Sequence, residues 1–139
     1  MKPRSTGRVA LSGHDPKAPL AIDHGFFTEP SDIDVVTEAL EAIRALARTA
    51  PVARYAAREE RLGGHGDARA HVLAEHRGFF HPVGTCAMGG VVDEAGRVFG
   101  VEGLRVADAS VMPTIPRVNT NLSTAAIAEP VAAMVLADR

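Results

Sequence analysis

The sequence contains little of what several protein classes require. Among 139 residues there is one cysteine and no tryptophan, and aromatic residues make up 4%. A single cysteine excludes an internal disulfide and a zinc site built from several cysteines. No apolar run reaches the roughly 20 residues of a membrane-spanning helix, and the basic start lacks the apolar stretch of a signal peptide. We therefore expect no membrane span and a cytoplasmic location.

The charge of the chain is nearly balanced. Fifteen lysines and arginines oppose 17 aspartates and glutamates, which gives a formal net charge of −2. Such a chain has no electrostatic attraction for nucleic acid or anionic membranes, so we expect neither as a partner. Charged residues at 23% and apolar residues at 46% are ordinary for a globular protein. Much of the apolar fraction is alanine, which predicts a folded domain with a thin core.

The first half of the sequence begins with two predicted strands and a helix. Residues 7–12 alternate apolar with small or polar side chains, and residues 20–27 are a second apolar run with strand character. A helix is predicted from Ser31, its expected N-cap, to about Arg48. Its apolar face is formed by residues at helical spacing: Val36, Leu40, Ile43 and Ala47.

Two shorter helices are predicted before residue 80. The first covers residues 52–61 and is ended by the glycine-rich segment 63–66. The second runs from Asp67, its expected cap, to His76.

The second half is rich in glycine, valine and proline and predicts fewer regular elements. Residues 93–96, DEAG, are typical of a hairpin turn, and residues 104–107 are predicted to be a strand. The alanine-rich segment 119–136 predicts a helix capped by Asn119 or Asn121. Because an interior proline removes a hydrogen bond at a cost of about 3 kcal/mol, we expect a kink or break at Pro130.

Six histidines are candidate functional residues. His81 differs from the others because it ends an apolar run, precedes a proline and is followed by a glycine turn. Such a partly dry position favours the neutral imidazole that a general base requires. A structural histidine is the alternative, and spacing alone favours it. The other five share no ligand spacing and are interpreted as surface side chains, so we expect no metal site: His14, His24, His65, His71 and His76.

A second candidate constellation follows the strand predicted over 104–107. It begins with Asp108 and Ala109 and ends where the last helix is expected to start, at Asn119 and Thr120. The ends of strands beside helix N-termini are where α/β sheets bind nucleotides, and a helix N-terminus attracts negative groups. The alternative is an ordinary aspartate turn followed by an asparagine cap.

Two segments carry a family resemblance. HPVGTCAMGG at 81–90 and GVEGLRVADASVMPTIPRVNTNLSTAAIAE at 100–129 resemble the C-terminal signature of the glucose–methanol–choline (GMC) oxidoreductases, and residues 7–27 resemble the start of the same region. The resemblance implies an α+β fold with an antiparallel sheet and packed helices. Residues 1–80 would be the substrate-domain portion. Residues 81–139 would hold the active-site histidine segment, then a strand and a helix of the FAD domain.

The resemblance also implies FAD-dependent oxidation of an alcohol CH–OH group to a carbonyl. His81 matches the family histidine beside the flavin N5, the proposed base for the substrate hydroxyl. Asn119 matches the second active-site position, which hydrogen-bonds the same oxygen while a hydride passes from carbon to N5.

Cofactor contacts are implied for two further segments. Asp108 and Ala109 match the segment that approaches the ribityl chain and pyrophosphate of FAD. Asn119 and Thr120 match the segment beside the isoalloxazine ring. Cys86 falls where the family often has cysteine and is interpreted as a buried, unreactive thiol because no basic residue neighbours it.

The sequence departs from the family in lacking the Gly-x-Gly-x-x-Gly turn that grips the FAD pyrophosphate, since residues 63–66 have the wrong spacing. We therefore expect an N-terminal GMC half, on another chain or missing from the gene model, as a partner beside a small-molecule alcohol. The alternative is a non-catalytic remnant or interaction module of the same fold, inactive without that half. An upstream reading frame encoding GMC N-terminal sequence would favour the enzyme.

Overall fold

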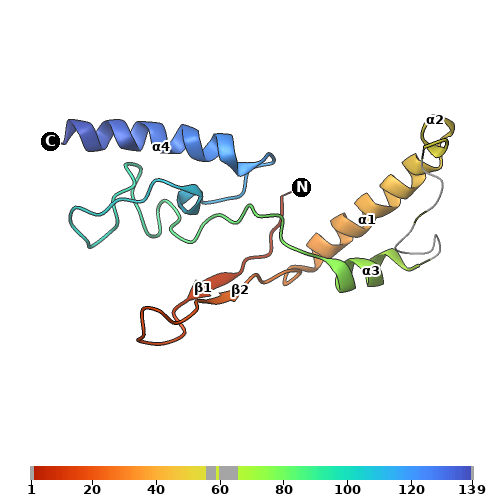
Figure 1. Ribbon diagram of the computed structural model, residues 1–139, viewed down its shortest axis with the longest axis horizontal. Coiled ribbons are helices and arrows are strands. Elements are labelled where there is room, and N and C mark those ends of the chain that lie inside the picture. The colour runs from red at the N-terminus through yellow and green to blue at the C-terminus, as the bar shows by residue number, and fades with distance from the viewer. Residues whose placement is uncertain (1, 56–58, 60–65, 139) are drawn as a thin grey trace. The chain divides into compact units, whose positions relative to one another are not determined.

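A computed structural model describes residues 2–55, 59 and 66–138 of the chain. Strands and helices are both present among these residues, which confirms the predicted α+β class. Their order is β1 (Arg8–Ala10), β2 (Ala21–Asp23), α1 (Pro30–Ala47), α2 (Ala50–Ala53), α3 (Ala68–Glu75), the 3-10 turn η1 (Ala109–Val111) and α4 (Thr120–Ala137) (Figure 1).

The strands β1 and β2 pair as a small antiparallel sheet. Both predicted strands are confirmed, but each is only three residues long and exposed throughout. Glycine is required beside them: a methyl group on Gly7 would lie 2.1 Å from the carbonyl oxygen of Asp23. The strands stay short because their side chains are buried on neither face.

Two compact units divide the chain, one formed by residues 1–3, 8–21 and 78–139 and the other by residues 4–7 and 22–77. We call them unit 1 and unit 2. The units reflect how densely residues contact one another and say nothing about which residues bind substrate or FAD. The assignment of 1–80 to a substrate domain and of 81–139 to the active-site histidine segment and the FAD-domain strand and helix therefore stays a prediction.

The main element of unit 2 is the 18-residue helix α1. It corresponds to the helix that the apolar periodicity predicted from Ser31 to about Arg48. Its N-cap is Glu29 and Pro30 opens its first turn, so the expectation of a Ser31 cap is wrong. Proline suits this position because the first helical N–H groups have no intrahelical partner. Asp32 in that turn instead accepts hydrogen bonds from the backbone N–H groups of Arg4 and Ser5, at 3.0 and 2.7 Å.

The helix α3 packs against α1 and has Asp67 as its cap, as predicted. The Asp67 carboxylate accepts from the backbone N–H of Arg69 at 3.0 Å. The helix predicted over 52–61 is present at residues 52–53, since α2 is one turn over Ala50–Ala53; Arg54 and Tyr55 form a turn, and residues 56–58 and 60–61 of the predicted helix lie outside the described residues. Residues 56–58 and 60–65, which include His65 and most of the glycine-rich segment 63–66, lie outside the described residues.

Unit 1 consists mostly of irregular backbone around a few buried side chains. The turn predicted at 93–96 is present, with the Gly96 N–H donating to the Asp93 carbonyl at 3.0 Å. The strand predicted over 104–107 is wrong: of these residues, all of them described, only Arg105 forms a bridge, to Arg97. A strand needs a continuous pairing partner, and this loop offers one bridge. The buried side chains in this unit are Val92, Val111, Met112, Thr120 and Val131.

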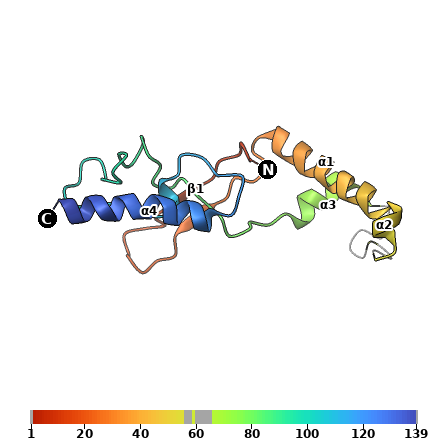
Figure 2. The same cartoon turned by 90° about the horizontal axis from the view of Figure 1, so that it is seen from above.

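The helix α4 runs unbroken through Pro130, so of the expected kink or break the break is wrong, and a kink there stays a prediction (Figure 2). Pro130 and Ala126, one turn before it, are both exposed, so water can take the hydrogen bond that the Ala126 carbonyl loses. Val131, the next residue, is buried and packs the helix into the interior of unit 1 directly after the proline.

The helix α4 is also long and apolar enough, by length and composition, to cross a membrane. The expectation that no segment reaches this threshold is therefore not supported. Apolar helices from the cores of soluble proteins pass the same test.

Candidate active site

The side chain of His81 is held against the first residue of α4. Its ring nitrogen Nδ1 lies 2.9 Å from Oγ1 of Thr120, which is 39 positions later in the sequence. His81 is half-buried and Thr120 is 7% exposed. Two of the sequence-predicted site residues are thus brought into direct contact within unit 1.

Backbone hydrogen bonds align the histidine segment with the segment that begins at Asp108. The N–H of Cys86 donates to the Ser110 carbonyl at 3.0 Å, and the N–H of Met88 donates to the Val111 carbonyl at 2.9 Å. The fully buried Val111 side chain lies under this ladder. The two motifs that carry the family resemblance therefore form one local structure.

Asp108 caps the short turn η1, which contains Ala109. Its carboxylate accepts hydrogen bonds from the backbone N–H of Ser110 at 2.8 Å and from the Ser110 hydroxyl. These hydrogen bonds, that of the Ser110 hydroxyl foremost, lower the pKa of Asp108 below its ordinary value. The Asp108 side chain is therefore committed to its own turn, and Ala109 is half-buried in it.

Asn119 occupies the N-cap position of α4, as one of the two predicted caps. Its exposed side chain makes no capping hydrogen bond in the described structure, so its amide is available to a ligand. The first N–H groups of this 18-residue helix add a partial positive charge at the same place. Because Asn119 directly precedes Thr120, it stands next to the residue that His81 contacts, and a shared role of His81 and Asn119 at one substrate oxygen stays a prediction.

Two phenylalanines beside the histidine were not predicted as site residues. The ring of Phe79 lies edge-on to the His81 ring, with centroids 5.7 Å apart. Phe79 is 76% exposed and Phe80 is 91% exposed, and Phe80 has a φ of 57° in the left-handed region. Large exposed apolar side chains next to a polar site are typical of a surface that binds something. The only sequence feature that could have indicated them is the pair of adjacent phenylalanines, which hydrophobic patterns identify only as part of an apolar run.

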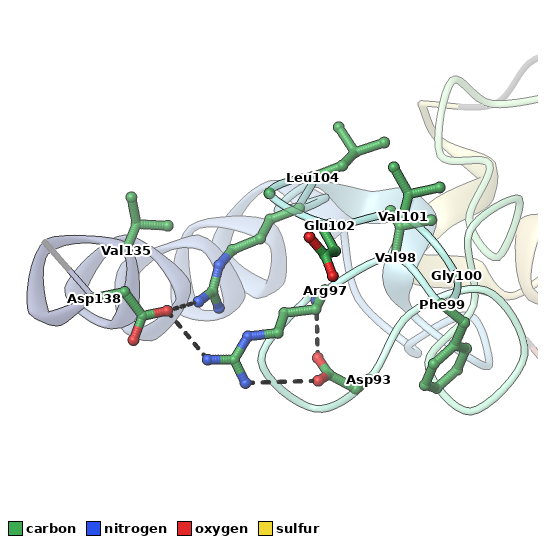
Figure 3. A pocket seen from close by; sticks show the side chains of 12 residues that line it. Asp93, Arg97, Val98, Phe99, Gly100, Val101, Glu102, Leu104, Val135 and Asp138 are labelled. Atoms are coloured by element: carbon green, nitrogen blue, oxygen red, sulfur yellow. Dashed lines mark hydrogen bonds and ion pairs between the residues drawn. The ribbon is translucent and has the colours of Figure 1, made fainter.

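An open groove of about 750 Å³ lies elsewhere in unit 1, between α4 and the 93–105 loop (Figure 3). None of the predicted site residues lines it. Its polar end holds Asp138, which accepts hydrogen bonds from Arg97 at 3.1 Å and from Arg105. These interactions, the Arg97 hydrogen bond foremost, lower the pKa of Asp138. Part of the groove is thus lined by a solvent-exposed ion-pair cluster of Asp138, Arg97 and Arg105.

The described His, Cys, Asp and Glu side chains outside this site form no metal-binding cluster. Among residues 2–55, 59 and 66–138, no group of three His, Cys, Asp or Glu side chains is placed to hold a metal ion. The free Cys86 is half-buried, so the prediction of a buried thiol is wrong. Its backbone N–H donates to the Ser110 carbonyl at 3.0 Å.

Comparison with known proteins agrees with this local structure. A family model described as GMC oxidoreductase matches residues 3–128. An oxygen-dependent choline dehydrogenase from Burkholderia ambifaria is 39% identical over 140 residues, which cover 95% of this chain and 25% of that protein.

Solved structures are similar over the same region. Formate oxidase from Aspergillus oryzae matches with a TM-score of 0.83 and 31% identity, over 96% of this chain and 25% of that one. Pyridoxine 4-oxidase from Mesorbium loti matches with a TM-score of 0.83 and 30% identity, over 96% and 28%. The chain therefore spans about a quarter of the length of these relatives.

Proposed function

The chain belongs to the GMC oxidoreductase family, and from this we propose that it supplies the base-carrying C-terminal part of an FAD-dependent oxidoreductase acting on CH–OH donors. The observation that carries the proposal is the 2.9 Å contact between His81 Nδ1 and Thr120 Oγ1. This contact holds an imidazole beside the start of α4, where the Asn119 amide and the first N–H groups of the helix are hydrogen-bond donors. Alcohol oxidation needs such a base beside hydrogen-bond donors.

In this proposal His81 accepts the proton of the substrate hydroxyl through Nε2, because Nδ1 is already bound to Thr120. The Asn119 amide donates a hydrogen bond to the same oxygen and keeps it within reach of the imidazole. Orientation of this kind converts an encounter into a single step within one complex. Phe79 and Phe80 form the apolar wall that the carbon chain of the alcohol contacts.

The donors present fit one part of FAD. The first-turn N–H groups of α4 and the Asn119 amide are hydrogen-bond donors, which suits the electron-rich carbonyl end of an isoalloxazine ring. When bound, the flavin would supply the acceptor for the hydride. The pyrophosphate needs a glycine-rich turn that this sequence does not contain. Asn119, Thr120 and η1 would therefore hold only part of the cofactor.

We accordingly propose that the remaining cofactor site comes from an N-terminal GMC portion, either on a second chain or on a longer form of this one. The support is that the chain spans 25% of the choline dehydrogenase relative. The isolated chain is expected to be colourless after purification, because the missing contacts weaken FAD binding by several kcal/mol, or orders of magnitude in Kd.

The test is reconstitution with the first three quarters of the Burkholderia ambifaria choline dehydrogenase. The two pieces are mixed with FAD, separated from free flavin, and exposed anaerobically to choline or pyridoxine. We expect a yellow complex whose flavin absorbance bleaches with one of the alcohols. A coloured complex that no alcohol bleaches would contradict the catalytic proposal and favour the non-catalytic module. A stoichiometric yellow chain without the N-terminal portion would contradict the proposed division of the cofactor site.

A further inference from the structure

The hydroxyl of Thr120 forms a hydrogen bond with the imidazole ring of His81. Oγ1 lies 2.9 Å from Nδ1, which is a normal hydrogen-bond distance. Thr120 is buried, with 7% of its surface exposed, and it is the first residue of the 18-residue helix α4. The hydroxyl therefore meets the ring from the first turn of a regular helix.

A neutral imidazole carries its single hydrogen on one ring nitrogen, and the other nitrogen is an acceptor. If Nδ1–H donates to Thr120 Oγ1, the lone pair is on Nε2. If the threonine hydroxyl donates to Nδ1, the hydrogen is on Nε2, and that nitrogen cannot take a proton. Free histidine favours hydrogen on Nε2, so a protein that needs a base there must supply an acceptor at Nδ1.

We propose that Thr120 is a positioning residue: its Oγ1 accepts the Nδ1 hydrogen of His81, which fixes the tautomer that leaves Nε2 as the base. The importance of this tautomer rests on the proposed function. The tautomer itself does not, because it is a property of the 139-residue chain alone.

The ring's other neighbour cannot perform this task. Phe79 contacts the His81 ring edge-on at 5.7 Å, but it has no hydrogen-bond acceptor other than its π-face and is largely exposed. It can restrict the tilt of the imidazole without selecting either nitrogen. Among the contacts that the structure gives to His81, the threonine oxygen is the one that distinguishes Nδ1 from Nε2.

The experiment is long-range proton–nitrogen NMR of the histidine rings in the full 139-residue chain, at a pH where they are neutral. His81 is assigned by the signal lost in His81→Gln. Thr120→Val removes the hydroxyl and keeps the branched shape, and Thr120→Ser keeps the hydroxyl. The matched control is Thr124→Val, which removes a hydroxyl from the same helix one turn away and leaves Nδ1 with its partner.

We expect hydrogen on Nδ1 in the natural chain, in Thr120→Ser and in Thr124→Val, and a shift towards Nε2–H in Thr120→Val. Hydrogen on Nε2 in the natural chain, or an unchanged tautomer in Thr120→Val, would overturn the proposal. Unchanged circular dichroism, together with the Thr120→Ser result, separates loss of the oxygen from loss of folding.

The reconstituted complex separates this inference from the proposed function. There Thr120→Val should lower the flavin reduction rate at saturating alcohol about 10–100-fold, the range seen for residues that orient metal-bound histidines. The alcohol concentration that gives half the maximal rate should stay unchanged. Thr120→Ser should restore the rate. If the tautomer depends on Thr120 but His81→Ala reduces flavin at the natural rate, the positioning contact stands and the base role fails. If His81→Ala is inactive and the tautomer of His81 is the same with and without the Thr120 hydroxyl, the base role stands and the positioning contact fails.

Discussion

Gly96 lies so close to Val106 that no side chain fits between them. The N–H of Val106 donates to the Gly96 carbonyl at 2.8 Å, and a methyl group on Gly96 would lie 2.5 Å from the Val106 carbonyl oxygen. The contact fixes the turn at 93–96 to the backbone that leads into the Asp108 segment. It therefore connects the turn to the candidate site through a short stretch of chain.

Gly96→Ala should destabilise the chain more than Gly100→Ala. Both glycines have positive φ, at 74° and 76°, so each substitution costs about 1–2 kcal/mol for the left-handed backbone. A methyl group on Gly100 meets nothing within 4 Å, and only Gly96 adds a backbone collision. We expect an additional loss of roughly 1–3 kcal/mol. Urea unfolding of both variants measures this difference, and equal midpoints would contradict the model of the turn.

Pro130→Ala should stabilise α4. The proline interrupts the hydrogen-bond ladder of an otherwise alanine-rich helix, and its ring is exposed, so replacing it loses no buried surface. The helix propensities differ by about 3 kcal/mol, which sets the upper limit of the gain. Circular dichroism and thermal unfolding should show more helix and a higher Tm. Glu129→Ala, at the exposed neighbouring position, is the control, and an equal gain there would refute the explanation.

The Asp138 cluster predicts a pH dependence of stability. Asp138 caps the C-terminal end of α4, where a negative charge is unfavourable, and Arg97 and Arg105 compensate for it. Because its pKa is lowered in the folded chain, its contribution is present above the unfolded value of 3.8 and is lost as the pH falls through the folded value.

Asp138→Asn should therefore lower Tm slightly at neutral pH and leave it unchanged once the pH is below the lowered pKa. The effect is small because the cluster is exposed to solvent. Glu102→Gln, at an exposed acid that lines the same groove, should change Tm at neither pH. A loss of Tm in Asp138→Asn that persists in acid would show that the carboxylate charge is not the cause.

Arg44 is the buried cation of unit 2. Its guanidinium donates to Glu41 at 2.6 Å, to Glu59 at 3.1 Å and to the Gly66 carbonyl at 3.1 Å. Burial opposes the charge, yet these two carboxylates raise the pKa of Arg44 overall. Arg44→Met should lower Tm because it leaves the Gly66 carbonyl and both carboxylates without their donor. Arg48→Met, at an exposed position of the same helix end, should not, and equal losses would contradict the role of the cluster.

The sequence predicted correctly those helices whose formation depends on residues close together in the chain. The apolar spacing from Val36 to Ala47 predicted α1, and Asp67 predicted the start of α3. The strand expected over 104–107 was wrong because a strand needs a run of paired residues, and the pairing here is a single bridge between Arg105 and Arg97. Of the kink or break expected at Pro130, the break was wrong, because Val131 is buried directly after the proline and solvent reaches the freed carbonyl.

The candidate site divides in the same way. The resemblance of residues 81–90 and 100–129 to the GMC signature identified His81 and the segment from Asp108 to Thr120, whereas spacing alone favoured a structural histidine. The pairing of His81 with Thr120 joins residues 39 positions apart, which no periodicity reveals. The edge-on contact of Phe79 was missed for a different reason: the sequence shows an apolar run before His81, and nothing in it shows that the two phenylalanine rings are exposed.

The role of His81 as the base is the central claim, and anaerobic flavin reduction in the reconstituted complex tests it most directly. His81→Ala should keep the yellow complex and lower the reduction rate at saturating alcohol by about 10²–10⁴-fold, the usual contribution of a general base. His14→Ala, at an exposed histidine of the same unit, should reduce flavin at the natural rate. A His81→Ala complex with bound FAD that reduces at the natural rate would contradict the account.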